Sequence, residues 1–140
     1  MNKHTEELMN ELKAVEHVKT FLTDNCDEIV CQDLQAYLAR LLMEKRLKKA
    51  EIIRSAEIDT VYGYQIFQGI KQPSRNKLLC LAVGMRLTIN ETQQLLRAAQ
   101  LGALYPRIKR DAIIIFGLER SLSVNEINDV LFELGEYTLG

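Results

Sequence analysis

The sequence has few of the residues that mark secreted, membrane-bound or metal-binding proteins. It contains 3 cysteines, 2 histidines, 2 prolines and no tryptophan in 140 residues. An odd number of cysteines, without a Cys-x-x-Cys pair or a nearby pair of histidines, gives no zinc spacing and favours reduced thiols. No apolar stretch approaches the roughly 18 residues of a membrane span, and the N-terminus, MNKHTEEL, lacks the basic-then-apolar order of a signal peptide. We therefore expect a cytoplasmic protein without membrane association.

Residues for catalysis are also scarce. The two histidines, His4 and His17, lie in an acidic N-terminal segment and form no triad or metal motif with Ser, Cys or carboxylates. The 7 glycines are dispersed, so that no glycine-rich phosphate loop is present. The sequence predicts neither an enzyme nor a cofactor or metal site.

A formal net charge of −1 hides an uneven distribution of charge. Residues 1–34 hold 3 Lys or Arg against 8 Asp or Glu, residues 35–100 hold 11 against 5, and residues 101–140 hold 4 against 6. Clustered basic residues are typical of phosphate binding, although they can also be a merely solvated face. The candidates for phosphate contact are Lys45, Arg46, Lys48, Lys49, Lys71, Arg75 and Lys77.

Two helices joined by a short turn are predicted within the basic segment. Residues 48–56 place their apolar side chains on one side and their charges on the other, which is the pattern of an amphipathic helix. Asp59 can accept a hydrogen bond from the N–H of Val61 or Tyr62 and so begin a second helix. That second helix is expected to end at Gly69, which can adopt a left-handed conformation.

A loop and a third helix follow. Pro73 bars continuation of the helix, so residues 70–73 are expected to form a loop, after which Ser74 can cap the next helix. The buried stripe of this third helix is predicted to contain Leu78, Leu81 and Ala82. Cys80 on the same helix is expected to be a small buried apolar residue.

The second helix presents one polar, uncharged side. A step of about 100° per residue turns Ile58, Tyr62 and Ile66 inward. The opposite side is predicted to be exposed and contains Thr60, Val61, Tyr64, Gln65 and Gln68. A helix fits the DNA major groove, where Gln pairs with adenine and Thr or Val contacts a thymine methyl group. Gln65 is the best single candidate for a base contact.

Helix, turn, helix, Gly stop, Pro-containing loop and third helix follow one another between residues 47 and 88. Over residues 34–96, about half of the chain, this order resembles the lambda-repressor-like (Cro/C1-type, XRE) helix-turn-helix family. The resemblance implies an all-α DNA-binding domain in which Lys49 contacts phosphate and Lys71 contacts the DNA backbone. It also implies that Thr60, Val61, Tyr64 and Gln65 contact bases.

Three positions depart from the pattern of that family. Glu57 in the turn and Arg86 after the third helix stand where the family usually has glycine, and a non-glycine residue held left-handed costs about 1 kcal/mol or more. Gly63 stands where a branched aliphatic residue is usual, and close packing of another helix would explain it.

The segments on either side of this motif are also predicted to be helical. Residues 5–22 repeat apolar side chains at amphipathic spacing, which suits packing on the same domain or on a partner or second copy. Residues 87–96 are echoed by residues 122–131, and Thr88 with Glu91 and Ser123 with Glu126 form potential capping boxes. An apolar helix at 111–118 makes residues 101–140 a helical pair. We expect this pair to extend the core and to support a dimer with recognition helices roughly 34 Å apart.

These patterns predict an all-α protein with three segments: an acidic helical segment at 1–33, a helix-turn-helix domain at 34–100 and a helical extension at 101–140. The predicted function is transcriptional regulation by a homodimer bound to double-stranded DNA, with the helix at 60–68 in the major groove. The alternative is a protein-interaction adaptor that uses the uncharged side of that helix against a regulatory protein partner.

Overall fold

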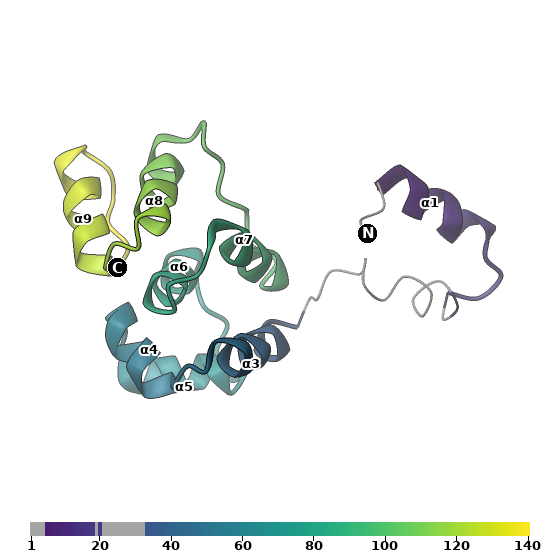
Figure 1. Ribbon diagram of the computed structural model, residues 1–140, viewed down its shortest axis with the longest axis horizontal. Helices are drawn as coiled ribbons and strands as arrows, with labels where there is room; N and C mark the ends of the chain where they lie inside the picture. The colour runs from purple at the N-terminus through teal and green to yellow at the C-terminus, as the bar shows by residue number, and fades with distance from the viewer. Residues whose placement is uncertain (1–4, 19, 21–32) are drawn as a thin grey trace. The chain divides into compact units, whose positions relative to one another are not determined.

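The computed structural model describes residues 5–18, 20 and 33–140, which contain helices and no strand (Figure 1). The chain divides into two compact units, Met1–Val30 and Cys31–Gly140. The helices are α1 (Thr5–Ala14), α3 (Leu34–Lys45), α4 (Lys49–Ala56), α5 (Thr60–Phe67), α6 (Arg75–Gly84), α7 (Ile89–Ala98), α8 (Lys109–Glu119) and α9 (Val124–Glu133). The prediction of an all-α protein is confirmed for this described part.

The first unit contains α1, which is shorter than predicted. The helix ends at Ala14, where the N–H of Val15 makes its last helical hydrogen bond to Glu11 at 3.1 Å, and helical structure returns at Val18 and Thr20. Val15 and His17 have weaker helix propensity than the Leu, Glu and Lys residues before them, which accounts for the early end. The predicted apolar positions 21 and 22 and two of the cysteines, at positions 26 and 31, lie outside the described residues. No residue of α1 is buried.

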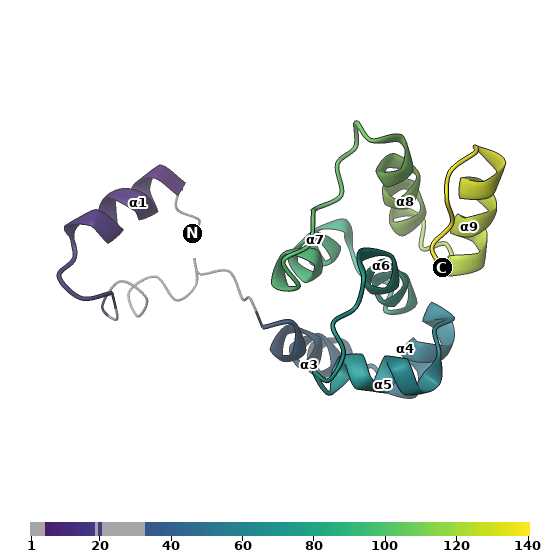
Figure 2. The same cartoon turned by 180° about the vertical axis from the view of Figure 1, so that it is seen from behind.

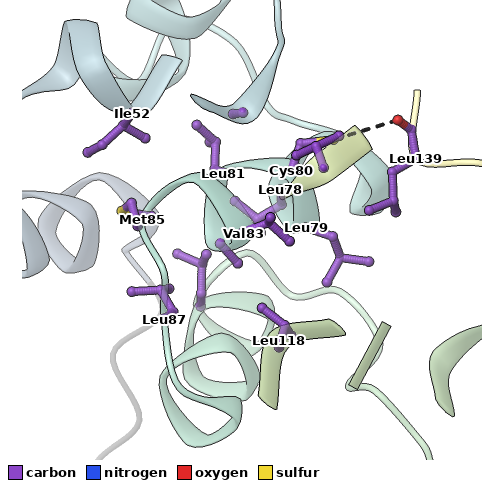
Figure 3. Close-up of a cluster of buried hydrophobic side chains, with 14 of the residues drawn as sticks. Ile52, Leu78, Leu79, Cys80, Leu81, Val83, Met85, Leu87, Leu118 and Leu139 are labelled. Atoms are coloured by element: carbon purple, nitrogen blue, oxygen red, sulfur yellow. Dashed lines mark hydrogen bonds between the residues drawn. The ribbon is translucent and has the colours of Figure 1, made fainter. Parts of the chain in front are cut away.

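Helix α6 is the centre of the second unit. Leu78 to Val83 are all buried, because α4, α7 and α9 pack around the helix. In both views α6 lies between the α4–α5 pair and the α8–α9 pair (Figure 1, Figure 2). Figure 3 shows Leu81 on the side of Ile52 from α4, and Cys80 beside Leu139 from the C-terminal tail. The predicted stripe of Leu78, Leu81 and Ala82 is confirmed, and the remaining sides of the helix are enclosed as well.

The last 40 residues belong to the same compact unit as the central helices. Ile114 of α8 and Ile127 and Leu131 of α9 have no exposed surface and join a single hydrophobic core with the residues of α3 to α7. Residues 101–140 therefore extend the core, as the apolar sequence of α8 predicts.

Short connections of one kind recur along this unit. In four of the described turns a left-handed, non-glycine residue ends one helix, an apolar residue turns into the core, and the next residue begins the following helix. The left-handed residues are Arg46, Glu57, Arg86 and Ser121, and the residues that begin the next helix are Lys48, Asp59, Thr88 and Ser123. Glu57 and Arg86 are the two positions where the resembled family usually has glycine, and both are left-handed.

The helix pairs α6–α7 and α8–α9 are two copies of one structural unit. Both predicted capping boxes are present, at Thr88 with Glu91 and at Ser123 with Glu126. The two helix pairs also share side-chain hydrogen bonds outside the capping boxes. In the first copy the side-chain amide of Gln93 both donates to and accepts from the backbone of Leu104, at 2.8 Å. In the second copy the amide of Asn128 does the same with Leu139, at 3.5 and 2.7 Å.

An arginine at the start of each pair repeats the same geometry. Arg75 donates to the carbonyl oxygens of residues 102 and 103, at 2.9 and 3.1 Å. Arg110 donates to those of residues 137 and 138, at 2.8 and 3.1 Å. Each of these positions is matched by the one 35 residues later, the spacing at which the sequence echo occurs. The duplication therefore runs from the first turn of the helix pair to the tail that follows it.

Candidate nucleic-acid interface

The turn between α4 and α5 brings these helices together within three residues. Glu57 is left-handed with φ of 56°, and Ile58 is buried at 8% exposure. The Asp59 carboxylate accepts a hydrogen bond from the N–H of Tyr62 at 3.0 Å, which satisfies one free donor of the first turn of α5. The N-cap predicted from sequence is confirmed.

Gly63 is the point at which α5 lies against α4. A β-carbon at this position would come 2.7 Å from Cγ1 and 2.9 Å from Cδ1 of Ile53, closer than carbon atoms can pack. Because Ile53 is itself buried at 2% exposure, it cannot move into solvent to make room. The absence of a side chain at Gly63 therefore permits a close approach of the two helices, as the departure from the family pattern led us to expect.

The outer side of α5 differs in part from the predicted one. Thr60, Val61 and Gln68 are exposed, Val61 at 64%. Tyr64 and Gln65 were predicted to be exposed but are half-buried, and Tyr64 packs against the core.

The inner side of α5 is formed by Ile66, Phe67 and Gly63, whereas Tyr62 was predicted inward and is only half-buried. The physical reason is the closeness of α4 at Gly63. Because α4 contacts α5 at Gly63, the buried side of α5 is centred on Gly63, Ile66 and Phe67 instead of on Tyr62. Tyr64 lies at the edge of this buried side.

A groove runs between α4 and α5, and its lining contains Ala50, Ile53, Arg54, Ile58, Thr60 and Tyr64. Arg54 is exposed at this groove and was not among the predicted phosphate ligands. A signal for Arg54 was present in the sequence, because this residue lies on the charged side of the helix predicted at residues 48–56. Tyr64 contributes to the groove from the opposite wall.

The predicted phosphate ligands fall into two groups. Arg46, Lys48, Lys49 and Lys71 are exposed, and the ammonium of Lys49 lies 5.8 Å from the centre of the Phe67 ring. Lys77 is half-buried, and Lys45 is half-buried with its ammonium 3.0 Å from the carboxylate of Glu91. The exposed group surrounds the start of α4 and the loop after α5, at either end of the helix-turn-helix.

Arg75, predicted as a phosphate ligand, makes its contacts within the chain. Its two terminal nitrogens lie 3.0 and 2.9 Å from the two carboxylate oxygens of Asp111, which is 3% exposed. Asp111 also accepts the N–H of Tyr105 at 3.0 Å. A bidentate pair of this kind uses the donors that a phosphate would need. Arg75 and Asp111 are 36 positions apart, so sequence spacing gave no signal for the pair.

The thiol of Cys80 is buried at 2% exposure, as predicted, and lies 3.8 Å from the carbonyl oxygen of Leu139. Burial raises the pKa of this thiol above its usual value, against the smaller lowering effect of Lys77. A thiol that stays protonated is a poor nucleophile, so the structure gives Cys80 a packing role.

Within residues 5–18, 20 and 33–140, no group of three or more His, Cys, Asp or Glu side chains is placed to hold a metal ion. None of the described helices combines the length and the apolar character that crossing a bilayer requires.

Comparison of the chain with protein-family models, with curated proteins and with solved structures finds no match.

Proposed function

We propose that this protein is a transcriptional regulator that binds double-stranded DNA with α5 in the major groove. The observation that carries the proposal is the uncharged outer side of α5, held firmly against α4 at Gly63 and flanked by exposed lysines. A helix fixed in this way can enter the groove without rearrangement, while the lysines meet phosphates on either side.

The outer residues of α5 have distinct proposed roles. Thr60 and Val61, at the first turn, are suited to contact thymine methyl groups, and Gln68 reaches outward at the end of the helix. Gln65 stays the principal candidate for pairing with adenine, although its half-buried position limits it to a base that lies deep against α5. Because α5 has no Lys or Arg, the site is expected to favour A·T pairs over guanine.

The first test is selection of bound fragments from randomised duplex DNA by the purified protein. We expect an inverted-repeat motif rich in A·T pairs, blurred or lost with a Tyr64→Ala, Gln65→Ala double variant. Failure of the wild-type protein to retain any duplex would reject the proposal. Recovery of the same motif by the double variant would reject Tyr64 and Gln65 as base contacts.

Salt dependence separates phosphate contacts from base contacts. If Lys48, Lys49 and Lys71 each neutralise one phosphate, the logarithm of affinity falls with the logarithm of salt concentration at a slope of about −3. Lys49→Ala should weaken binding to all sequences alike and reduce the slope by about 1. Lys45→Ala is the matched control, because that side chain is paired with Glu91, and its slope should stay near that of the wild type.

A protein partner for the same surface is the second candidate function. The exposed Val61 and the half-buried Tyr64 favour it, since apolar and aromatic side chains are typical anchors of protein interfaces. The two functions differ in salt response. An interface anchored by Val61 and Tyr64 should change affinity far less with salt than one anchored by lysines on phosphate.

A further inference from the structure

Large apolar side chains are exposed where α9 ends. Phe132 is 80% exposed, Leu134 is 47% exposed and Tyr137 is 89% exposed. They lie within six residues on a turn fixed by backbone hydrogen bonds from Gly135 to Phe132, at 3.1 Å, and from Glu136 to Leu131, at 2.8 Å. We call these three residues the C-terminal patch. Exposed aromatic residues gathered on an ordered turn are typical of an interaction site.

The duplicated helix pair supplies an internal reference for this patch. Thirty-five positions earlier, on the same turn of the first copy, the chain has Arg97 in place of Phe132, Ala99 in place of Leu134 and Gly102 in place of Tyr137. The turn is held in the same way in both copies, with the amide of Gln93 or Asn128 on the backbone that follows. Since the first copy folds with Arg, Ala and Gly, the fold does not require apolar side chains there.

We propose that the C-terminal patch is the contact through which two copies of this chain associate. Apolar side chains suit a two-fold interface, because each residue meets its own counterpart or a neighbour and no like charges are forced together at the centre. The charged residues next to the patch are Glu133 and the pair of Lys109 and Glu136, whose ammonium and carboxylate lie 3.9 Å apart. Because Lys109 and Glu136 already neutralise one another, these residues add little net charge that would repel a second copy.

The size of the patch fits the centre of such an interface. Two aromatic side chains of roughly 150–250 Å² each, exposed at 80% and 89%, together with half of a leucine, give about 400 Å². A stable interface buries about 800 Å² on each partner. The patch would supply about half of this area, as the apolar centre of an interface that has a polar rim.

The position of the patch is compatible with DNA binding but does not depend on it. In both views α9 lies on the far side of α6 from α5 (Figure 1, Figure 2). A second copy docked on α9 would leave the outer side of α5 open. The association is a property of the protein alone, so it is tested without DNA.

The test is sedimentation equilibrium of the full chain over a wide range of concentrations. We expect the wild-type protein to form dimers. A triple variant, Phe132→Arg, Leu134→Ala and Tyr137→Gly, takes its residues from the first copy and should weaken association at least about tenfold. Met43→Arg is the matched control, because Met43 is 82% exposed on α3, outside the patch, and its loss should leave association unchanged.

Two outcomes would overturn the inference. One is a wild-type protein that stays monomeric at the highest concentration, and the other is a triple variant that associates as tightly as the wild type. Circular dichroism and thermal melting establish that the triple variant is folded. If it is not, Phe132→Arg alone gives the same test at the exposed end of α9. A dimer that retains no DNA would refute the proposed function and leave this interface intact.

Discussion

Glu57 occupies a conformation that a side chain disfavours. Its φ of 56° places it in the left-handed region, which costs a non-glycine residue about 1–2 kcal/mol. We expect Glu57→Gly to relieve this strain and, after the greater entropy of glycine in the unfolded chain is subtracted, to stabilise the protein by up to about 1 kcal/mol. Urea unfolding monitored by circular dichroism measures the change.

Ser55→Gly, two residues earlier, is the control for Glu57→Gly. Ser55 is exposed and lies inside α4, so glycine there should destabilise the protein by several tenths of a kcal/mol. Changes of the same sign in the two variants would contradict the account of strain at Glu57.

A side chain at Gly63 should destabilise the protein. A β-carbon at Gly63 would lie 2.7 Å from Cγ1 of Ile53, and forcing atoms into a packed core typically costs about 1–3 kcal/mol. We expect Gly63→Ala to lower the free energy of unfolding by about 1 kcal/mol, because the better helix propensity of alanine offsets part of the clash. Gly102→Ala is the control, since a β-carbon there would meet no atom within 4 Å, and it should be neutral or slightly stabilising. An equal effect at both glycines would refute the close packing.

Between elements, the ion pair of Arg75 and Asp111 links α6 to α8. Because Asp111 is 3% exposed, removing its partner leaves a buried charge, which typically costs about 3–5 kcal/mol. We expect Arg75→Ala to lower the stability by that amount in denaturant unfolding. Arg40→Ala removes an arginine from an exposed pair with Glu44, at 65% and 54% side-chain exposure, and should cost less than about 1 kcal/mol. Comparable losses would mean that Arg75 does not hold the two helices together.

The two capping boxes make the stability of α7 and α9 depend on pH. Burial raises the pKa of Glu91, but hydrogen bonds from Thr88 and Lys45 outweigh it, and the pKa lies below its usual 4.5. Hydrogen bonds from Ser123 lower the pKa of Glu126 in the same way. Because these pKa values are lower in the folded protein, the stabilisation is complete above the unfolded pKa and is lost as the pH falls through the folded values.

Glu126→Gln tests this dependence, because glutamine keeps the capping hydrogen bond and loses the titration. We expect its melting temperature to fall less than that of the wild type between about pH 5 and pH 3. Glu133→Gln is the control, because it removes the same charge from α9 at a position outside the capping boxes. A Glu126→Gln curve parallel to the wild-type curve would argue against the role of the ionised carboxylate.

Local signals in the sequence predicted the elements well. Asp59, Ser74, Thr88 and Ser123 were expected to cap helices and do so, because each cap is formed within three residues of sequence. The pair of Arg75 and Asp111 could not be predicted, because it joins residues from separate helices. The half-buried state of Tyr64 and Gln65 also escaped prediction, since a helical step of 100° gives the spacing of a face and not the depth of the neighbour that covers it.

At the scale of the whole molecule, the core residues of the described part come from positions 37–139. No residue of α1 is buried. We expect a chain of residues 31–140 to have a melting temperature within about 2 °C of that of the full chain, because α1 contributes no buried residue to the core. In a domain of this size, a change of about 1 kcal/mol in the free energy of unfolding shifts the melting temperature by roughly 4–8 °C. Calorimetry of both chains provides the comparison.

The control for this truncation is a chain that ends at residue 100. It loses Ile114, Ile127 and Leu131 from the core and should not fold. A large loss of stability on removal of residues 1–30 alone would show that the acidic segment contributes to the fold.

The duplicated helix pair gives this protein a simple route to a change in length. Each copy has an arginine in its first turn and ends with a tail that this arginine and a side-chain amide hold in place. Insertion of a further copy of this helix pair would leave these hydrogen bonds in place, whereas loss of the second copy would remove Asp111 from Arg75. A gene for this chain could therefore grow in steps of 35 codons while α4 and α5 are kept intact.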